Sequence, residues 1–115
     1  MNDAVLRQLN LLLGTPDGRA FVRSSMARLR EYAPDILAEL KRHGLPPELL
    51  AIPLVESGYR DLPAKSLAGA GLWMFIAPTA RHYGLEVSAI RDERLKIRAE
   101  TSAAMRMFSD LRNRF

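Results

Sequence analysis

The chain of 115 residues contains no cysteine, no long apolar run and no recognisable export signal. The lack of cysteine excludes disulfides and thiolate chemistry, although it does not fix the compartment. No segment approaches the roughly 18 apolar residues that a membrane-spanning helix needs. The N-terminal Met1-Asn2-Asp3 has neither a basic segment nor a small-residue cleavage site, so we predict that this sequence contains no signal peptide.

Metal and cofactor sites are not indicated either. His43 and His82 are the only histidines, and neither has another ligand at a spacing typical of metal sites. We interpret His43 as a helix-end residue that interacts with the helix dipole, and His82 as a surface residue. Gly69-Ala70-Gly71 lacks the preceding strand that a phosphate-binding loop needs. We therefore expect no metal and no cofactor.

A modest excess of positive charge is the main bias in composition. The 17 Lys and Arg residues outnumber the 13 Asp and Glu residues, which gives a net charge of +4. Such an excess favours anionic partners, among them nucleic acids, acidic lipid surfaces and anionic cell-wall glycans. Because the basic residues are spread along the chain, a dedicated nucleic-acid patch is weakly supported, and we expect no nucleic-acid partner.

Apolar residues recur at helical spacing over most of the chain, and no alternating strand pattern is present. Gly14 is predicted to end a first helix. Thr15-Pro16-Asp17 is predicted to begin a second one, as N-cap, first helical residue and first-turn acid. Pro34 either kinks this helix or starts the next, and His43-Gly44 is a typical helix end.

Shorter elements are predicted for the rest of the chain, and together they indicate a single all-α domain. In order, they are a helix from 45 to about 57 bent at Pro53, a loop over 58–70, short helices near 71–76 and 78–83, and a last amphipathic helix after Asp92-Glu93-Arg94.

Glu56 is the residue that most clearly indicates chemistry. It follows the apolar run Leu49–Val55 and precedes Ser57-Gly58-Tyr59. A carboxyl beside apolar side chains tends to keep its proton to higher pH, because desolvation disfavours the anion. This property suits a general acid, and Ile52, Leu54, Val55, Leu72 and Trp73 are candidates to form the apolar pocket. The alternative is a helix-terminal glutamate that merely meets solvent.

Trp73 and Asp61 are the other residues considered for a site. An aromatic ring near a carboxyl is typical of a sugar-binding site, because the apolar faces of sugars stack on aromatic rings. Trp73 is the only tryptophan, and it is equally well interpreted as a core anchor. Asp61 is the nearest other acid in sequence, and we interpret it as a solvated loop residue. Glu56 therefore has no obvious second carboxylate, in contrast to ordinary glycosidases.

The ordered motifs resemble the lytic murein transglycosylase family, in particular its membrane-bound D type with a goose-lysozyme-like catalytic domain. The resemblance covers about residues 44–115, most securely 49–85, and residues 1–43 look like a helical lead-in. The motifs are Pro53–Tyr59, Ser66–Trp73, Pro78–Leu85, Asp92-Glu93-Arg94 and Glu100–Ala104.

The resemblance implies a peptidoglycan lytic transglycosylase in the periplasm or cell envelope. Glu56 corresponds to the single catalytic acid/base, and Ser57 to the residue that helps orient its carboxyl. Gly71, Leu72, Trp73 and Met74 match the motif that lines the glycan cleft. In this family the glutamate cleaves the bond between N-acetylmuramic acid and N-acetylglucosamine, and it leaves 1,6-anhydro ends without using water.

The sequence departs from the family pattern in ways that leave alternatives open. Many members carry glutamine at the position of Met74, and methionine cannot make the contact of that amide. The downstream Ala-Tyr-Asn segment does not occur before Phe115, so we expect the domain to be incomplete at its C-terminal end. The alternatives are a hydrolytic muramidase, a non-catalytic peptidoglycan-binding fragment and, from charge alone, a nucleic-acid binder.

Overall fold

The computed structural model describes residues 3–64 and 69–114. Ser66, with which the second motif begins, lies outside these ranges. The described part of the chain is all-α, as predicted, with isolated β-bridges and no strand. Its elements are α1 (Asp3–Gly14), α2 (Pro16–Arg42), the 3₁₀ helix η1 (Pro47–Leu50), α3 (Ala51–Ser57), α4 (Ala77–His82), the 3₁₀ helix η2 (Glu93–Leu95) and α5 (Ile97–Arg114).

The ends of the long helix α2 are where the sequence predicts them. The Thr15 hydroxyl accepts the N–H of Gly18 at 3.0 Å, and Pro16 occupies the first turn, where its missing donor costs nothing. The helix continues through Pro34, so a new helix does not start there. At the other end, Nδ1 of His43 lies 2.9 Å from the Glu39 carbonyl oxygen, which confirms His43 as a helix-end residue.

The segment that carries Glu56 begins as a 3₁₀ turn and becomes α-helical at Ala51. Pro53 therefore lies in the first turn of α3, where the absence of its N–H breaks no helical hydrogen bond. The helix ends at Gly58, which adopts a left-handed conformation with φ of 61°. This ending places Glu56 in the last turn of a short helix.

The short helix predicted near 71–76 is wrong. Residues 69–75 instead form a turn, hereafter the 69–75 turn, which is closed by the 3.0 Å hydrogen bond from the Ala70 N–H to the Phe75 carbonyl. Gly71 and Met74 have φ angles of +79° and +53°, and left-handed residues cannot continue a right-handed helix. The next prediction is confirmed, because α4 lies within one residue of its expected bounds.

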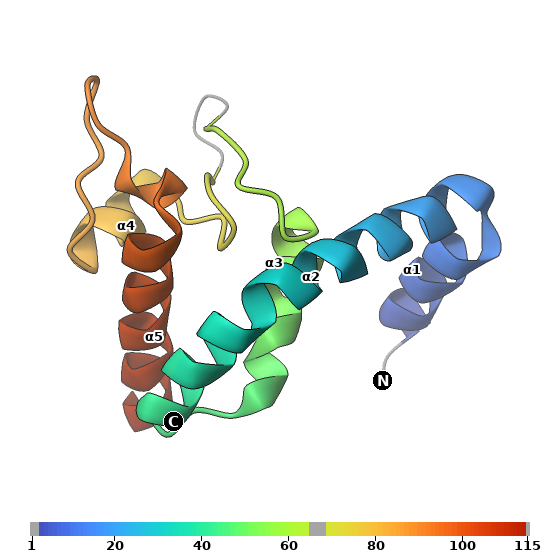
Figure 1. Cartoon of the computed structure of the whole chain (residues 1–115), viewed down its shortest axis with the longest axis horizontal. Coiled ribbons are helices and arrows are strands. Elements are labelled where there is room, and N and C mark those ends of the chain that lie inside the picture. Colours follow the sequence, from blue (N-terminus) through green and yellow to red (C-terminus); the bar gives the residue numbers. More distant parts are fainter. Residues whose placement is uncertain (1–2, 65–68, 115) are drawn as a thin grey trace.

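The core lies where α2, α5 and the 69–75 turn meet, and Figure 1 shows the C-terminal part of α2 beside α5. By contrast, α1 and the start of α2 form an arm that extends away from this core, with exposed leucines such as Leu11 and Leu13. The residues of the core that α2, α5 and the turn contribute are Ile36, Leu40, Leu72, Trp73, Phe75, Ala103, Ala104 and Met105.

Candidate active site

The side chain of Glu56 is exposed at the end of α3, and no residue in the described ranges hydrogen-bonds to its carboxylate. The residues in the described ranges do not form the apolar pocket that was expected around it. Val55 is 80% exposed, whereas Leu72 and Trp73 point into the core. The carboxyl is therefore available to a ligand, and any removal of water from it has to come from what binds there.

Ser57 attaches the end of α3 to the 69–75 turn. Its side chain is 3% exposed, and its hydroxyl lies 2.7 Å from the Leu72 carbonyl oxygen and 3.0 Å from that of Pro53. The single hydroxyl proton is thus directed at backbone acceptors and not at Glu56. Ser57 fixes the position of the helix end that carries Glu56, which is an indirect way of orienting the carboxyl.

Gly71 is required by close packing inside the turn. Its N–H donates to the Leu62 carbonyl at 2.7 Å, which ties the loop after α3 to the turn. A Cβ at Gly71 would overlap the carbonyl oxygen of Arg94 and lie 2.6 Å from Oε1 of Glu100. The turn can approach η2 and α5 this closely only because residue 71 has no side chain.

Trp73 is a core anchor in this structure, which agrees with the second of its two interpretations. The side chain is 6% exposed, and its ring packs edge-to-face on Phe108 with centroids 5.7 Å apart. The indole N–H donates to the Thr101 hydroxyl at 3.0 Å. Met74, beside it, is half-buried and held at positive φ. The turn can therefore contribute backbone groups and Met74 to a cleft, but not the indole face.

The hydrogen bond between Trp73 and Thr101 gives a direct test of this packing. In Thr101→Val the shape of the side chain is kept, but the buried indole N–H loses its acceptor. We expect a loss of about 1–3 kcal/mol in the free energy of unfolding, measured by urea denaturation with circular dichroism. Thr101→Ser, which keeps the hydroxyl, should cost less than Thr101→Val. A valine variant as stable as the parent would contradict the role of this bond.

The buried Glu100 and the partly exposed Asp61 lie behind the turn, and their association was not predicted from the sequence. Glu100 is fully buried, and its Oε1 accepts the Trp73 N–H at 3.2 Å. Burial is the largest cause that raises the pKa of Glu100 to about 10, and a hydrogen bond with Asp61 adds to it. Asp61 is only partly exposed and one of its oxygens is buried, so its prediction as a solvated loop residue is wrong.

A buried arginine supports the same turn from the other side. Arg94 is 5% exposed, donates to the Phe75 carbonyl at 3.1 Å and pairs with Asp92 at 2.8 Å. The guanidinium hydrogen bonds hold the pKa of the Asp92 carboxyl below its usual range. The Arg94 guanidinium and the Asp92 carboxylate thus bind each other and support the turn, and neither is free to act as a catalytic group.

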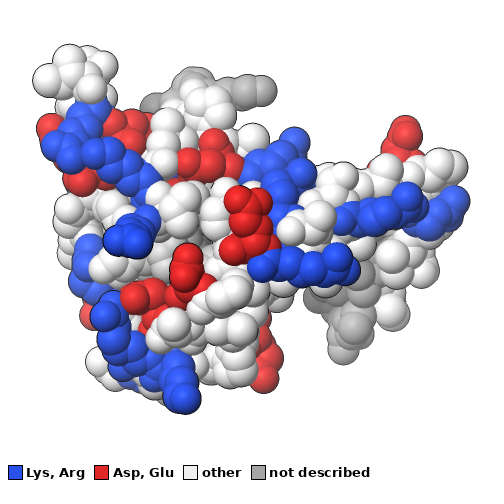
Figure 2. Space-filling model, viewed as in Figure 1, with Lys and Arg blue, Asp and Glu red and all other residues white. Residues whose placement is uncertain are grey.

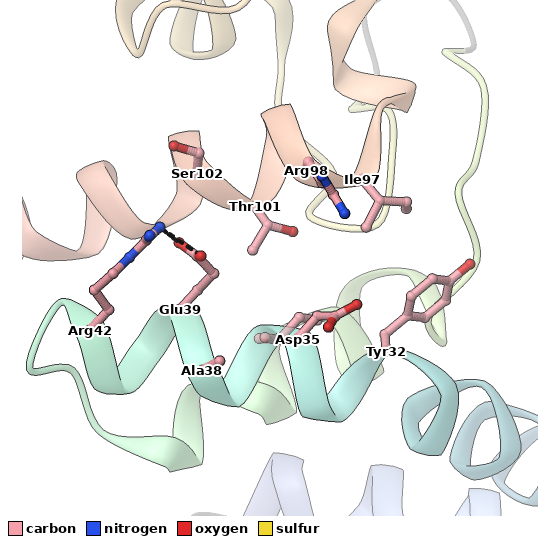
Figure 3. Close-up of a pocket in the computed structure, with 10 residues that line it drawn as sticks. Tyr32, Asp35, Ala38, Glu39, Arg42, Ile97, Arg98, Thr101 and Ser102 are labelled. Atoms are coloured by element: carbon pink, nitrogen blue, oxygen red, sulfur yellow. Dashed lines mark hydrogen bonds and ion pairs between the residues drawn. The ribbon is translucent and has the colours of Figure 1, made fainter.

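A pocket of about 410 Å³ lies between α2 and α5, and Glu56 is not among its lining residues. Figure 3 shows Arg98 of α5 pointing toward Asp35 of α2, with Tyr32 at one end and Arg42 at the other. The α5 wall of this pocket therefore carries one positive charge, and the α2 wall carries charges of both signs. It is a separate hollow from the exposed end of α3 that presents Glu56.

The surface charge follows the composition. On the face shown in Figure 2, basic side chains are spread from one end of the molecule to the other and are interleaved with acidic ones.

Among the residues with described positions, no cluster of three metal-ligating side chains occurs, and no helix is long and apolar enough to cross a membrane. His82 is exposed, in agreement with its interpretation as a surface residue.

Comparison with known proteins places these features in context. Residues 35–115 match the transglycosylase SLT domain family, and this match begins inside the predicted lead-in. Over 97 residues the chain is 30% identical to the membrane-bound lytic murein transglycosylase D of Escherichia coli K12 and to that of E. coli O6:H1. It is 29% identical over 89 residues to a putative tributyltin chloride resistance protein of Alteromonas.

These alignments cover most of this chain but a smaller part of each relative. They span 84% of the chain for the two E. coli proteins and 77% for the Alteromonas protein. The corresponding shares of the relatives are 22% and 43%.

Proposed function

Since the chain belongs to the transglycosylase SLT domain family, we propose that it acts on peptidoglycan glycan strands with Glu56 as the single acid/base. The observation that carries this proposal is the exposure of Glu56 at the end of a helix whose last turn is fixed to the 69–75 turn through Ser57. The murein named in the E. coli relatives supports the choice of substrate, and it also supports a place in the cell envelope.

The proposed reaction needs one carboxyl in two successive roles. Glu56 gives its proton to the glycosidic oxygen as the bond from that oxygen to C1 of N-acetylmuramic acid breaks. The carboxylate that remains takes the proton of the muramic acid 6-hydroxyl, whose oxygen closes on C1. The product is a 1,6-anhydro ring, Glu56 regains its proton, and no water is consumed. Sugar rings laid over the exposed carboxyl would exclude water and favour its neutral form.

The position of Asp61 argues against the hydrolytic alternative. A muramidase of the ordinary kind uses a second carboxylate to activate water or to attack the sugar. Asp61 follows Glu56 closely in sequence, but its side chain is engaged with Glu100. The structure thus offers Glu56 no second carboxylate from the nearest candidate, which favours ring closure by the 6-hydroxyl.

Digestion of peptidoglycan sacculi tests the proposal. We expect the purified chain to release muropeptides with 1,6-anhydro ends, identified by mass spectrometry, and not muropeptides with reducing ends. Reducing ends would instead show a hydrolase. Sedimentation with sacculi without any released product would show the non-catalytic binding fragment, for which the exposed and unenclosed Glu56 is the supporting observation.

A further inference from the structure

Glu100 lies at the point where three segments of the chain meet. Its side chain is 0% exposed in the first turn of α5. Oε1 accepts the N–H of Trp73 from the 69–75 turn. Burial is the largest cause that raises the pKa of Glu100, and Asp61, a neighbouring carboxyl from the loop that follows α3, adds to it. A Cβ at Gly71 would lie 2.6 Å from Oε1, so the turn is packed directly against this group.

Glu100 and Asp61 each have a buried carboxyl oxygen without a hydrogen-bond donor, unless the two carboxyls share a proton. Oε2 of Glu100 and Oδ1 of Asp61 are both buried, and neither accepts a hydrogen bond from the rest of the described chain. Two neighbouring carboxylates out of water repel one another and leave costly unpaired charge. One proton held between them supplies the missing donor and removes one of the two charges.

The charged groups around Glu100 and Asp61 do not neutralise the negative charge that two ionised carboxyls would carry. Burial is the largest cause that raises the pKa of Tyr32 of α2. The negative charges of Glu31, Asp61 and Glu100 add to it, and Arg28 opposes it. Arg94 of η2 is engaged with Asp92. The 69–75 turn contributes the backbone N–H groups of Leu72 and Trp73. Among the described residues, therefore, no cation contributes to the pKa of Glu100 in a way that would hold both carboxyls ionised.

We propose that Glu100 keeps its proton in the folded protein at neutral pH and donates it to Asp61, and that this carboxyl pair positions the end of α3 that carries Glu56. The pair holds the loop after α3 through Asp61, and it holds the 69–75 turn through the N–H of Trp73. In the same turn, the carbonyl of Leu72 accepts a hydrogen bond from the Ser57 hydroxyl at the end of α3. Glu100 is thus a positioning residue. Its effect on cleavage rests on the proposed function, whereas its protonation does not.

Glu100→Gln keeps the geometry and removes the titration. The amide oxygen can accept the Trp73 N–H, and the amide N–H can replace the proton donated to Asp61. In the folded parent chain, burial and then Asp61 raise the pKa of Glu100 to about 10, whereas the ordinary value of 4.5 applies to the unfolded chain. Between those values the folded state holds one more proton, so stability falls as pH rises. The unfolding equilibrium constant then increases by about tenfold for each pH unit.

We expect urea denaturation from pH 5 to pH 9 to show this loss in the parent chain and a shallower dependence on pH in Glu100→Gln. Glu48→Gln is the matched control, because Glu48 is exposed and the variant should keep the slope of the parent. Infrared spectra give a direct readout, since a protonated carboxyl band should persist at pH 8 in the parent and vanish in Glu100→Gln. The same slope in both proteins, or no such band, would overturn the proposal.

Cleavage of sacculi tests the positioning role. Glu100→Gln should retain the release of anhydro products, whereas Glu100→Ala, which leaves Asp61 and the Trp73 N–H without a partner, should lower it by about tenfold or more. Equal activity of the alanine variant and the parent would overturn the positioning role. A parent chain without activity would overturn the proposed function alone, and the denaturation and infrared results would still decide whether Glu100 carries the proton.

Discussion

In Glu56→Gln we expect the release of anhydromuropeptides from sacculi to fall by about 10²–10⁴-fold, the usual contribution of general acid–base catalysis. Glutamine keeps the size and polarity of the side chain but has no proton to give to the glycosidic oxygen. Because Glu56 is exposed and lacks a hydrogen-bond partner among the described residues, the free energy of unfolding should change by less than about 0.5 kcal/mol.

Glu48→Gln is the matched control for that experiment. Glu48 is an exposed acid in η1, just before the helix that carries Glu56, and the substitution removes the same charge. Its activity should equal that of the parent. If Glu56→Gln released product at the parent rate while remaining folded, the assignment of Glu56 as acid/base would be wrong, whatever the family membership of the chain.

Gly71→Ala should have the largest effect on stability. The new methyl group would overlap the Arg94 carbonyl oxygen and crowd Oε1 of Glu100, and the residue would also have to hold a φ of +79°. Strain of this kind is about 1–3 kcal/mol for the backbone conformation alone. With the overlap added, we expect a loss of more than about 4 kcal/mol, a large share of the stability of a domain of this size.

Gly44→Ala separates the two causes. Gly44 has a similar φ of +65°, but the nearest atom to an added Cβ is an Arg112 side-chain nitrogen at 3.7 Å, an ordinary contact. This variant should lose only about 1–2 kcal/mol, the cost of a left-handed residue with a side chain. Both variants can be measured by urea denaturation. Equal losses would show that the close approach of the turn to η2 and α5 contributes little.

The sequence predicted the local features of the fold well, because caps and helix ends depend on nearby residues. Thr15 and Pro16 start α2 and the His43-Gly44 pair ends it, and each acts through its own backbone or side chain. The motif around Glu56 also identified the family, since it depends on residue order. The proposed boundary between residues 43 and 44 stays a prediction, although Ile36 and Leu40 of α2 belong to the core.

Features that depend on packing between distant segments were not predicted. Apolar residues near Glu56 in sequence suggested a pocket around its carboxyl, but Leu72 and Trp73 turn inward to the core. Asp61 pairs with Glu100, and nothing local to Asp61 indicates this. A signal for the burial of Glu100 did exist. It lies three and four residues before Ala103 and Ala104, on the apolar face of the same helix.

The burial of Trp73 has a practical consequence for work with this protein. As the only tryptophan of the chain, it is a natural fluorophore, and its ring is enclosed beside Thr101 and Phe108. Its emission will report whether the turn is seated on α5 and will respond little to a sugar at the surface. Glycan affinity should therefore be followed with a labelled glycan. A red shift of the intrinsic emission would signal that the domain has opened.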